Sequence, residues 1–154
     1  MTIADLKKIV REIVAQARQL NAAHTSEEDA PVNYACVFAQ DEAEYKELID
    51  LASQLGPIAQ ETAMGPVFHI KPLPTVAGNL ELLKIRRPDP KRREKGDADF
   101  TVADYQSFKK EYLGKPGFNI IKRPEMEMLE LINPSYNTIV YFSHPTLAAI
   151  LKIK

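Results

Sequence analysis

The first part of the chain repeats its apolar positions with the period of an amphipathic helix. Between residues 2 and 23, apolar side chains recur at intervals of three and four, and charged side chains occupy many of the positions between them. Thr2 followed by Asp5 resembles a capping pair and predicts where the helix begins. Such a stripe packs against the protein's own core or a dimer partner, or it docks on another protein or a membrane surface. Helices of this kind are usually stabilised by packing, so we expect the first arrangement.

Beyond this helix the pattern changes to short stretches of strand formers, separated by turns and by further helical segments. Asp41 and Asp104 each stand at the N-cap position of a predicted helix. Pro72 and Pro74 are expected to interrupt strand structure. The predicted helices are 41–55 and 104–112, and the predicted strands are 32–39, 58–62, 67–71, 80–86, 97–102, 118–122, 126–132 and 138–142.

Two of these strands carry similar sequences with one acid in each. Residues 79–85 read NLELLKI and residues 128–132 read MLELI, so that Glu81 and Glu130 interrupt apolar runs. A carboxylate within a strand is costly unless it faces a wet pocket or holds a cation. The order strand, capped helix, then strands occurs twice, which predicts a duplicated βαβββ unit with one acid on the last strand of each copy.

This order resembles the vicinal oxygen chelate superfamily, the glyoxalase/dioxygenase-like proteins, and within it the YecM-like group of metal-binding proteins. The resemblance covers roughly residues 30 to 150 and rests on three features besides the repeat. A helix precedes the first unit, the charged link RRPDPKRR leads into the second, and the chain ends in YFSHPTLAAIL. In that family two βαβββ units form a cupped, incomplete barrel around a divalent metal, with ligands from the first and last strands of each unit.

We therefore expect an α+β protein in which two βαβββ modules form a cupped mixed β-sheet, with helices outside and an N-terminal amphipathic helix. A chain of 154 residues is typical of a single domain. Residues 86–96 are the only concentrated basic run, but they contain acids and prolines and no aromatic residue, which favours an exposed connector over a nucleic-acid site. The expected parts of the domain 1–154 are the N-terminal helix at 1–23, the first module at 31–87, the second module at 97–143 and a tail at 144–154.

Strand alternation predicts which side chains face the cup. From the first strand of each unit, these are Tyr34, Cys36 and Phe38, and Asp97, Asp99 and Thr101. From the strands with the repeated acids, they are Glu81, Leu83 and Ile85, and Met126, Met128, Glu130 and Ile132. An apolar and aromatic cup with a few carboxylates is typical of a small-molecule pocket. The predicted ligand pocket consists of Tyr34, Cys36, Phe38, Thr101 and Met128.

The resemblance also implies a metal site. The family's ligand positions fall on Glu81, Asp97 and Glu130, with Asp99 nearby as the catalytic base. The histidine that is usual on the first strand is missing, because its position falls on Asn33 or Tyr34. Clustered carboxylates without histidine favour Mg²⁺, Mn²⁺ or Ca²⁺ over Zn²⁺.

Two other arrangements of the acids remain open. Crowded acids raise one another's pKa, and one of them could serve as a general acid or base without a cation. Alternatively, Lys84, Arg86 or Arg123 neutralises them in a salt-bridge network. His69 stands among apolar residues and is more typical of a hydrogen-bonded core or rim histidine than of a ligand.

Two functions follow from these alternatives. The first is a metal-dependent lyase, isomerase or dioxygenase-like enzyme, in which the cation polarises a carbonyl or enolate oxygen. The second is a non-catalytic ligand-binding or scaffold protein that kept the fold and lost the metal ligands, which the missing histidines favour. A homodimer built through the N-terminal helix fits either.

Composition narrows the partners and the compartment. The net charge of −1 offers no general attraction to nucleic acid or to anionic membranes. The single Cys36 excludes an internal disulfide framework and favours a reducing compartment. No apolar run approaches the roughly 18 residues of a membrane span. We expect a cytoplasmic protein with a small-molecule ligand and neither a nucleic-acid nor a membrane partner.

Overall fold

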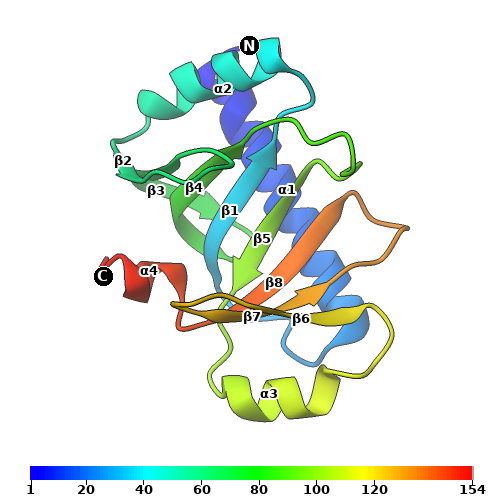
Figure 1. The fold of residues 1–154 in the computed structure, drawn as a ribbon. Coiled ribbons are helices and arrows are strands. Elements are labelled where there is room, and N and C mark those ends of the chain that lie inside the picture. The colour runs from blue at the N-terminus through cyan, green and yellow to red at the C-terminus, as the bar shows by residue number, and fades with distance from the viewer. Residues whose placement is uncertain (154) are drawn as a thin grey trace.

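Eight strands form one continuous mixed sheet in the computed structural model, which describes residues 1–153 (Figure 1). Their order across the sheet is β2-β3-β4-β1-β5-β8-β7-β6. The strands are β1 (Val32–Phe38), β2 (Ile58–Gln60), β3 (Val67–Thr75), β4 (Gly78–Arg86), β5 (Gly96–Phe100), β6 (Phe118–Lys122), β7 (Glu127–Leu131) and β8 (Thr138–His144). The helices are α1 (Ile3–His24), α2 (Glu42–Ser53), α3 (Tyr105–Tyr112) and α4 (Leu147–Ile150).

The sheet consists of two βαβββ modules joined at its centre, as the sequence predicts. The first module runs β1-α2-β2-β3-β4 and the second β5-α3-β6-β7-β8. In each module the first strand pairs in parallel with the last, β1 with β4 and β5 with β8. The two first strands, β1 and β5, pair antiparallel with each other and join the modules. The N-caps predicted at Asp41 and Asp104 begin α2 and α3.

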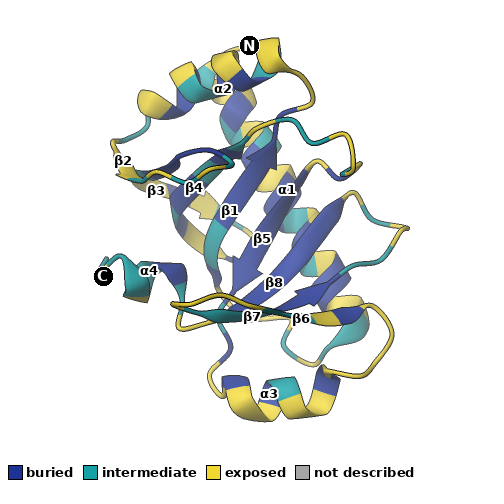
Figure 2. Ribbon diagram, viewed as in Figure 1, coloured by how far each residue is buried: buried dark blue, intermediate teal, exposed yellow. Residues whose placement is uncertain are grey.

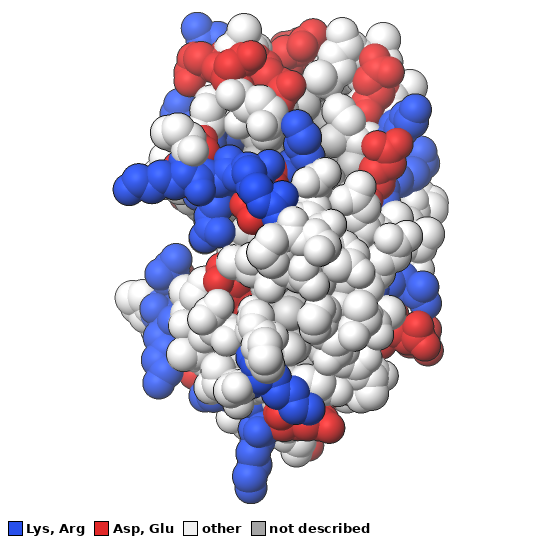
Figure 3. All heavy atoms as spheres, turned by 90° about the vertical axis from the view of Figure 1, so that its right-hand side faces the viewer, with Lys and Arg blue, Asp and Glu red and all other residues white. Residues whose placement is uncertain are grey.

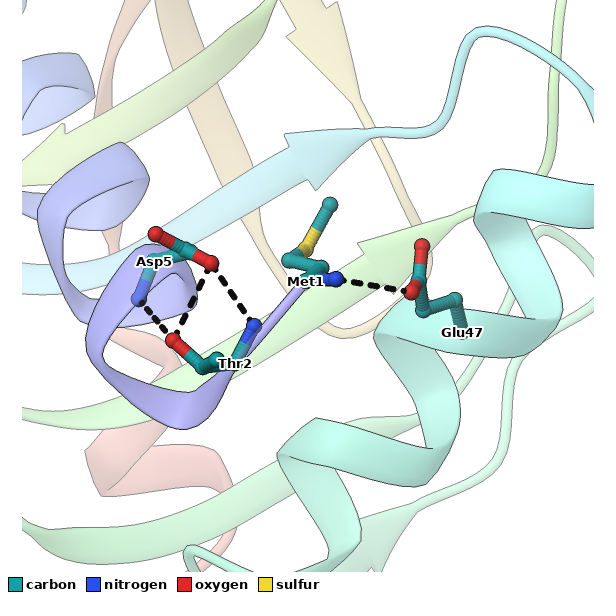
Figure 4. Close-up of polar contacts among 4 residues, drawn as sticks. All are labelled: Met1, Thr2, Asp5 and Glu47. Carbon is teal, nitrogen blue, oxygen red and sulfur yellow. Dashed lines mark hydrogen bonds and ion pairs between the residues drawn. The ribbon is translucent and has the colours of Figure 1, made fainter.

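The long helix α1 lies behind the centre of the sheet and packs against β1, β5 and β8 (Figure 1). It begins with the predicted capping box, in which the Asp5 N–H donates to Thr2 Oγ1 at 3.2 Å and the Thr2 N–H donates to Asp5 Oδ2 at 2.8 Å (Figure 4). The Met1 amino group forms an ion pair of 3.2 Å with Glu47 of α2. The apolar stripe is buried within the chain at Leu6, Val10, Ile13, Val14, Ala17 and Leu20. No helix among residues 1–153 is long and apolar enough to cross a membrane.

The two faces of the central strands have different environments. Ala35, Ala98 and Val140 belong to the main core beneath the helices. Cys36, Phe38, Ile139 and Tyr141 form a second cluster on the opposite, concave face. Figure 2 shows that β1, β5 and β8 are buried along most of their length.

The predicted break at Pro72 and Pro74 is wrong, because β3 continues through both prolines to Thr75. Its partner β2 is only three residues long and pairs at Val67 and Phe68, so the rest of β3 is the edge of the sheet. An edge strand tolerates proline because the missing N–H removes no ladder hydrogen bond. The register between β3 and β4 also shifts between His69 and Leu73, which accommodates the irregular segment.

The connector between β4 and β5 is more than the solvated loop that its composition predicts. The Arg93 guanidinium donates to the backbone oxygens of Pro134 at 2.6 Å and Tyr136 at 2.9 Å, and so fastens the connector to the β7–β8 turn. The guanidinium of Arg87 lies 4.8 Å from the ring centroid of Tyr45. Glu94 is buried. Hydrogen bonds to backbone carbonyls, which composition does not reveal, hold this segment in place.

The tail predicted at 144–154 contains the short helix α4; Lys154 lies outside the described residues. Leu147 of α4 packs with Val67 and Leu82 on the concave side of the first module. The Ala148 N–H donates to Asn33 Oδ1 at 3.3 Å. The tail therefore covers one end of the concave face.

Candidate functional site

The concave face contains a cleft of about 390 Å³ between the two modules. Its floor comes from β1, β5 and β8, and its walls come from β4, β7, α4 and the segments beside them. The cleft is lined by Tyr34, Cys36, Gln60, Thr62, Met64, Val67, Lys84, Arg86, Arg92, Asp97, Ile121, Arg123, Glu125, Met126, Met128, Glu130, Tyr141, Leu147 and Ile150.

Strand register places the polar residues of the cleft side by side. Cys36 is the direct partner of Lys84 on β4 and of Asp97 on β5. Side chains at paired positions point to the same face of a sheet, so these three form one row across the floor. The next row runs through Tyr34, Asp99, Tyr141 and Glu130, each paired with the next.

Asp97 is a buried acid at the floor of the cleft. Its residue is 5% exposed, and its Oδ1 atom has no hydrogen-bond partner among residues 1–153. Burial raises the pKa of Asp97 to about 8, with a further increase from the Asp99 charge. The charges of Lys84, Arg86 and Arg92 lower this pKa, but by less than burial and Asp99 raise it.

Asp99, the predicted catalytic base, lies deeper than Asp97. It is completely buried and does not line the cleft. Its carboxylate accepts hydrogen bonds from the Ser143 hydroxyl and from the Ser143 N–H, the second at 3.2 Å. Burial raises the pKa of Asp99 to about 7, and the bonds from Ser143 oppose this change. In this arrangement Asp99 holds β8 against β5 and has no direct access to a ligand in the cleft.

Glu130 lines the cleft from β7. The Tyr141 hydroxyl donates to Glu130 Oε2 at 3.0 Å, and a guanidinium nitrogen of Arg92 lies 3.9 Å from the same oxygen. The prediction that Glu130 stands on the last strand of its module is wrong, because β8 follows β7 and is the strand that pairs with β5. The matching letters around the two acids therefore do not reflect equivalent strand positions.

Glu81 lies apart from the cleft. Its Oε1 atom is 3.7 Å from Nε2 of His69, and its side chain is 39% exposed. The neighbouring Leu83 and Ile85 belong to the main core beneath the helices, so the predicted cup face of β4 is wrong. The parallel pairing of β1 with β4 instead places Lys84 beside Cys36. The pairing of β4 with β1 determines which side chains of β4 face the cleft, and the sequence of β4 alone does not reveal this.

The predicted ligand-pocket residues are divided between the cleft and its surroundings. Tyr34, Cys36 and Met128 line the cleft. Phe38 lies at its rim, where its ring carries the Arg86 guanidinium at 4.7 Å and lines a neighbouring hollow of about 220 Å³. Thr101 lies beyond the end of β5 and outside the cleft, and its N–H donates to the Pro31 carbonyl at 2.9 Å.

Four basic side chains line the cleft, which the sequence prediction did not expect as a group: Lys84, Arg86, Arg92 and Arg123. Arg86 forms an ion pair of 3.1 Å with Asp89, whereas Lys84 and Arg123 form no ion pair with any residue from 1 to 153. The alternative in which Lys84, Arg86 or Arg123 neutralises the acids through salt bridges is therefore not found among residues 1–153, where Arg92 is the basic residue that lies beside Glu130. Figure 3 shows basic side chains gathered at its left edge, the side that faces the viewer in Figure 1. In the sequence, the spacing of Lys84 and Arg86 by two residues already indicates that both side chains share one face of their strand.

The three predicted metal ligands do not form one donor set. Asp97 and Glu130 share the cleft, but Glu81 does not line it. Among residues 1–153, no group of three or more His, Cys, Asp or Glu side chains is placed to hold a metal ion. The residues present thus do not fit a three-carboxylate site, although the unpartnered Oδ1 of Asp97 leaves one acceptor open.

Comparisons with known proteins support the fold. No family model matches the chain, and no curated protein sequence matches it. A solved structure described as "Structural Genomics, Protein EC4020" is similar over 97% of this chain and 88% of its own, with 13% identity and a TM-score of 0.68. A glyoxalase/bleomycin resistance protein/dioxygenase superfamily member from Vibrio splendidus 12B01 is similar over 74% of this chain and 97% of its own, with 6% identity and a TM-score of 0.49. The first likeness shows that nearly all of this chain adopts a fold found in another protein.

Proposed function

We propose that this protein binds a small organic molecule in the cleft and that Asp97 is the polar group that orients it. The observation that carries the proposal is the Asp97 carboxylate at the floor of the cleft, whose buried Oδ1 atom has no hydrogen-bond partner among residues 1–153. A buried polar atom without a hydrogen bond is costly, and a ligand that supplies the missing bond regains that free energy. The volume of about 390 Å³ and the mixed aromatic and polar lining suit a small-molecule site.

The proposal includes the family as well as the site. We take the chain as a divergent member of the glyoxalase/dioxygenase-like vicinal oxygen chelate superfamily, in its YecM-like branch. Two βαβββ modules with paired first strands, and a cleft on the concave face between them, support this assignment. Within that family, the cleft of this chain favours a ligand-binding protein over the metal-dependent enzyme, because the acids of the two modules do not converge.

A divalent cation at Asp97 and Glu130 is the second candidate, favoured by the same unpartnered oxygen. Such a cation would need other ligands besides these two carboxylates and would compete with Arg92 for Glu130. Metal analysis of protein purified without chelators tests it, together with thermal unfolding in Mg²⁺, Mn²⁺, Ca²⁺ or Zn²⁺. Stabilisation that Asp97→Asn abolishes would support the cation, and an unchanged unfolding midpoint in all four would contradict it.

The methionines of the chain provide a direct test of the ligand site. Met64, Met126 and Met128 line the cleft, and the fourth methionine, Met1, is exposed and precedes α1. Screening small organic compounds by methyl NMR of the methionine-labelled protein should therefore find ligands that shift the three cleft methyls and leave Met1 unchanged.

Substitution at Asp97 then tests its role. Asp97→Leu removes the polar group and should weaken the binding of such a ligand by about tenfold or more. Asp97→Asn keeps a polar group and should weaken it less. Asp50→Asn, at an exposed position on α2, is the matched control and should have no effect. The proposal is contradicted if ligands shift the cleft methyls equally in the wild type, Asp97→Asn and Asp97→Leu.

A further inference from the structure

The charge of the cleft differs in sign from that of the whole chain. Four basic side chains line it, Lys84, Arg86, Arg92 and Arg123, against the three acids Asp97, Glu125 and Glu130. The chain as a whole carries a formal charge of −1. A concave site that gathers an excess of one charge attracts ligands of the opposite charge more strongly than a flat surface does.

The basic groups of the cleft are only partly neutralised. Lys84 stands in the floor row beside Cys36 and forms no ion pair with the described residues. Arg92 reaches Glu130 only at 3.9 Å, and the Tyr141 hydroxyl donates to the same carboxylate oxygen at 3.0 Å. Both cations thus retain donors that can bind an incoming anion.

The position of Arg86 and Arg92 connects the cleft with the smaller hollow beside it. Both residues line the cleft of about 390 Å³ and the hollow of about 220 Å³. The Arg86 guanidinium is held over the Phe38 ring at 4.7 Å and by Asp89 at 3.1 Å, while its buried Nε atom has no partner within residues 1–153. Arg86 is therefore fixed at the mouth of the cleft with one donor unused.

The remaining wall of the cleft suits the body of an organic molecule. Tyr34, Ile121, Met128 and Tyr141 provide aromatic, aliphatic and thioether surface on the concave side. Aromatic and thioether surfaces of this kind bind flat or flexible apolar groups without strict orientation.

Because the cleft has basic groups on one side and an apolar wall on the other, we propose that the ligand is an organic anion, a carboxylate or a phosphate ester. Its charged group binds to Lys84 and Arg92 beside Arg86, and its apolar body lies against Tyr34, Met128 and Tyr141. The inference rests on the proposed ligand-binding function and specifies its ligand class. Charge-assisted hydrogen bonds from lysine and arginine are the usual means by which proteins hold either group.

Three small probes of the same ring size test the inference: benzoate, phenyl phosphate and the neutral benzamide. Dissociation constants are measured by titration of the methionine methyl signals of the full chain, at low and at high salt. We expect at least one anion to bind about tenfold more tightly than benzamide and to lose affinity as salt screens the basic groups. The tighter of the two anions identifies the charged group as carboxylate or phosphate.

Two substitutions and a control assign the effect to the cleft. Lys84→Gln and Arg92→Gln should each weaken anion binding about three- to tenfold and weaken benzamide binding by a smaller factor, because the neutral amide has no charge for these groups to attract. Lys46→Gln, at an exposed position on α2 without an ion pair among the described residues, should change neither. Far-UV circular dichroism of each variant shows whether it is folded, and the two cleft variants are independent of each other.

The outcomes separate this inference from the proposed function. Benzamide binding at the cleft methyls as tightly as both anions would overturn the anion class and leave the ligand-binding function intact. Anion binding that neither Lys84→Gln nor Arg92→Gln weakens would overturn it as well. If none of the probes shifts the cleft methyls at millimolar concentration, the anion class is overturned, and the wider compound screen then decides the ligand-binding function separately.

Discussion

The hydroxyl of Tyr141 donates a hydrogen bond of 3.0 Å to Glu130, its direct partner across β7 and β8. Glu130 is 6% exposed, so its carboxylate has little contact with water, and the hydrogen bond from Tyr141 replaces part of the lost hydration. Tyr141 also pairs with Asp99 on β5. Tyr141 thus connects Glu130 in the cleft wall to the central strand β5.

Replacing this tyrosine by phenylalanine should destabilise the protein. Tyr141→Phe leaves the Glu130 carboxylate with Arg92 at 3.9 Å as its remaining partner, and we expect a loss of about 1–2 kcal/mol in the free energy of unfolding. Urea denaturation followed by circular dichroism measures it. Tyr136→Phe is the matched control, because no hydrogen bond of its hydroxyl is formed among the described residues. Equal stability of the two variants would show that the bond to Glu130 contributes nothing.

Asp97 should make the protein less stable at alkaline pH. Its pKa is about 8 in the folded protein against 3.8 for the unperturbed group, so between these values the folded state holds a proton that the unfolded state has released. The free energy of unfolding therefore falls as the pH rises from about 4 to about 8, and this contribution is constant outside that window. Asp97→Asn cannot ionise and removes this dependence.

The measurement compares chemical unfolding of both proteins at several pH values. Between about pH 5 and pH 9, the wild type should lose on the order of 4 kcal/mol more than Asp97→Asn does. Asp50→Asn, which changes an exposed carboxylate, should follow the wild type. Parallel curves for the wild type and Asp97→Asn would mean that Asp97 ionises in the folded protein as easily as in the unfolded chain.

The bond between Ser143 and Asp99 should matter most when Asp99 is charged. The hydroxyl and the N–H of Ser143 both donate to the buried Asp99 carboxylate. Both bonds lower the pKa of Asp99, which is about 7. Ser143→Ala removes the hydroxyl bond and should cost about 1–3 kcal/mol at about pH 9 and clearly less at about pH 5. A double-mutant cycle with Asp99→Asn isolates the pairwise contribution. A coupling energy that does not change with pH would contradict this role of the hydroxyl.

The sequence predicts the parts of the site that local rules determine. The alternation of β1 and β5 correctly places Cys36 and Asp97 on the concave face, and the aspartate caps correctly begin α2 and α3. The sequence-based prediction fails where the pairing of strands that are distant in the sequence determines which side chains face the cleft. The face of β4 is set by its parallel pairing with β1, which places Lys84 beside Cys36, and no pattern within β4 reveals that choice.

One basic residue of the cleft, Arg92, was missed for a related reason. Arg92 belongs to the connector between the modules, whose charges and prolines are typical of a solvated loop. Only the folded chain shows that the connector is fastened to the β7–β8 turn by Arg93 and returns Arg92 to the cleft. Hydrogen bonds between segments more than 40 residues apart leave no local trace in the sequence.

The packing of α4 on the concave face leads to a last prediction. Leu147 is 8% exposed, forms a small cluster with Val67 and Leu82, and lines one end of the cleft. Leu147→Ala should therefore cost about 2 kcal/mol, near the lower limit for a buried leucine, because the cluster lies at the edge of the protein. Leu113→Ala, at a position that is 37% exposed, is the matched control and should cost less than about 0.5 kcal/mol. Urea denaturation gives both values, and methyl NMR of the cleft methionines should show a change only for Leu147→Ala. If the methyl signals stay unchanged while stability falls, α4 contributes to the fold without shaping the cleft.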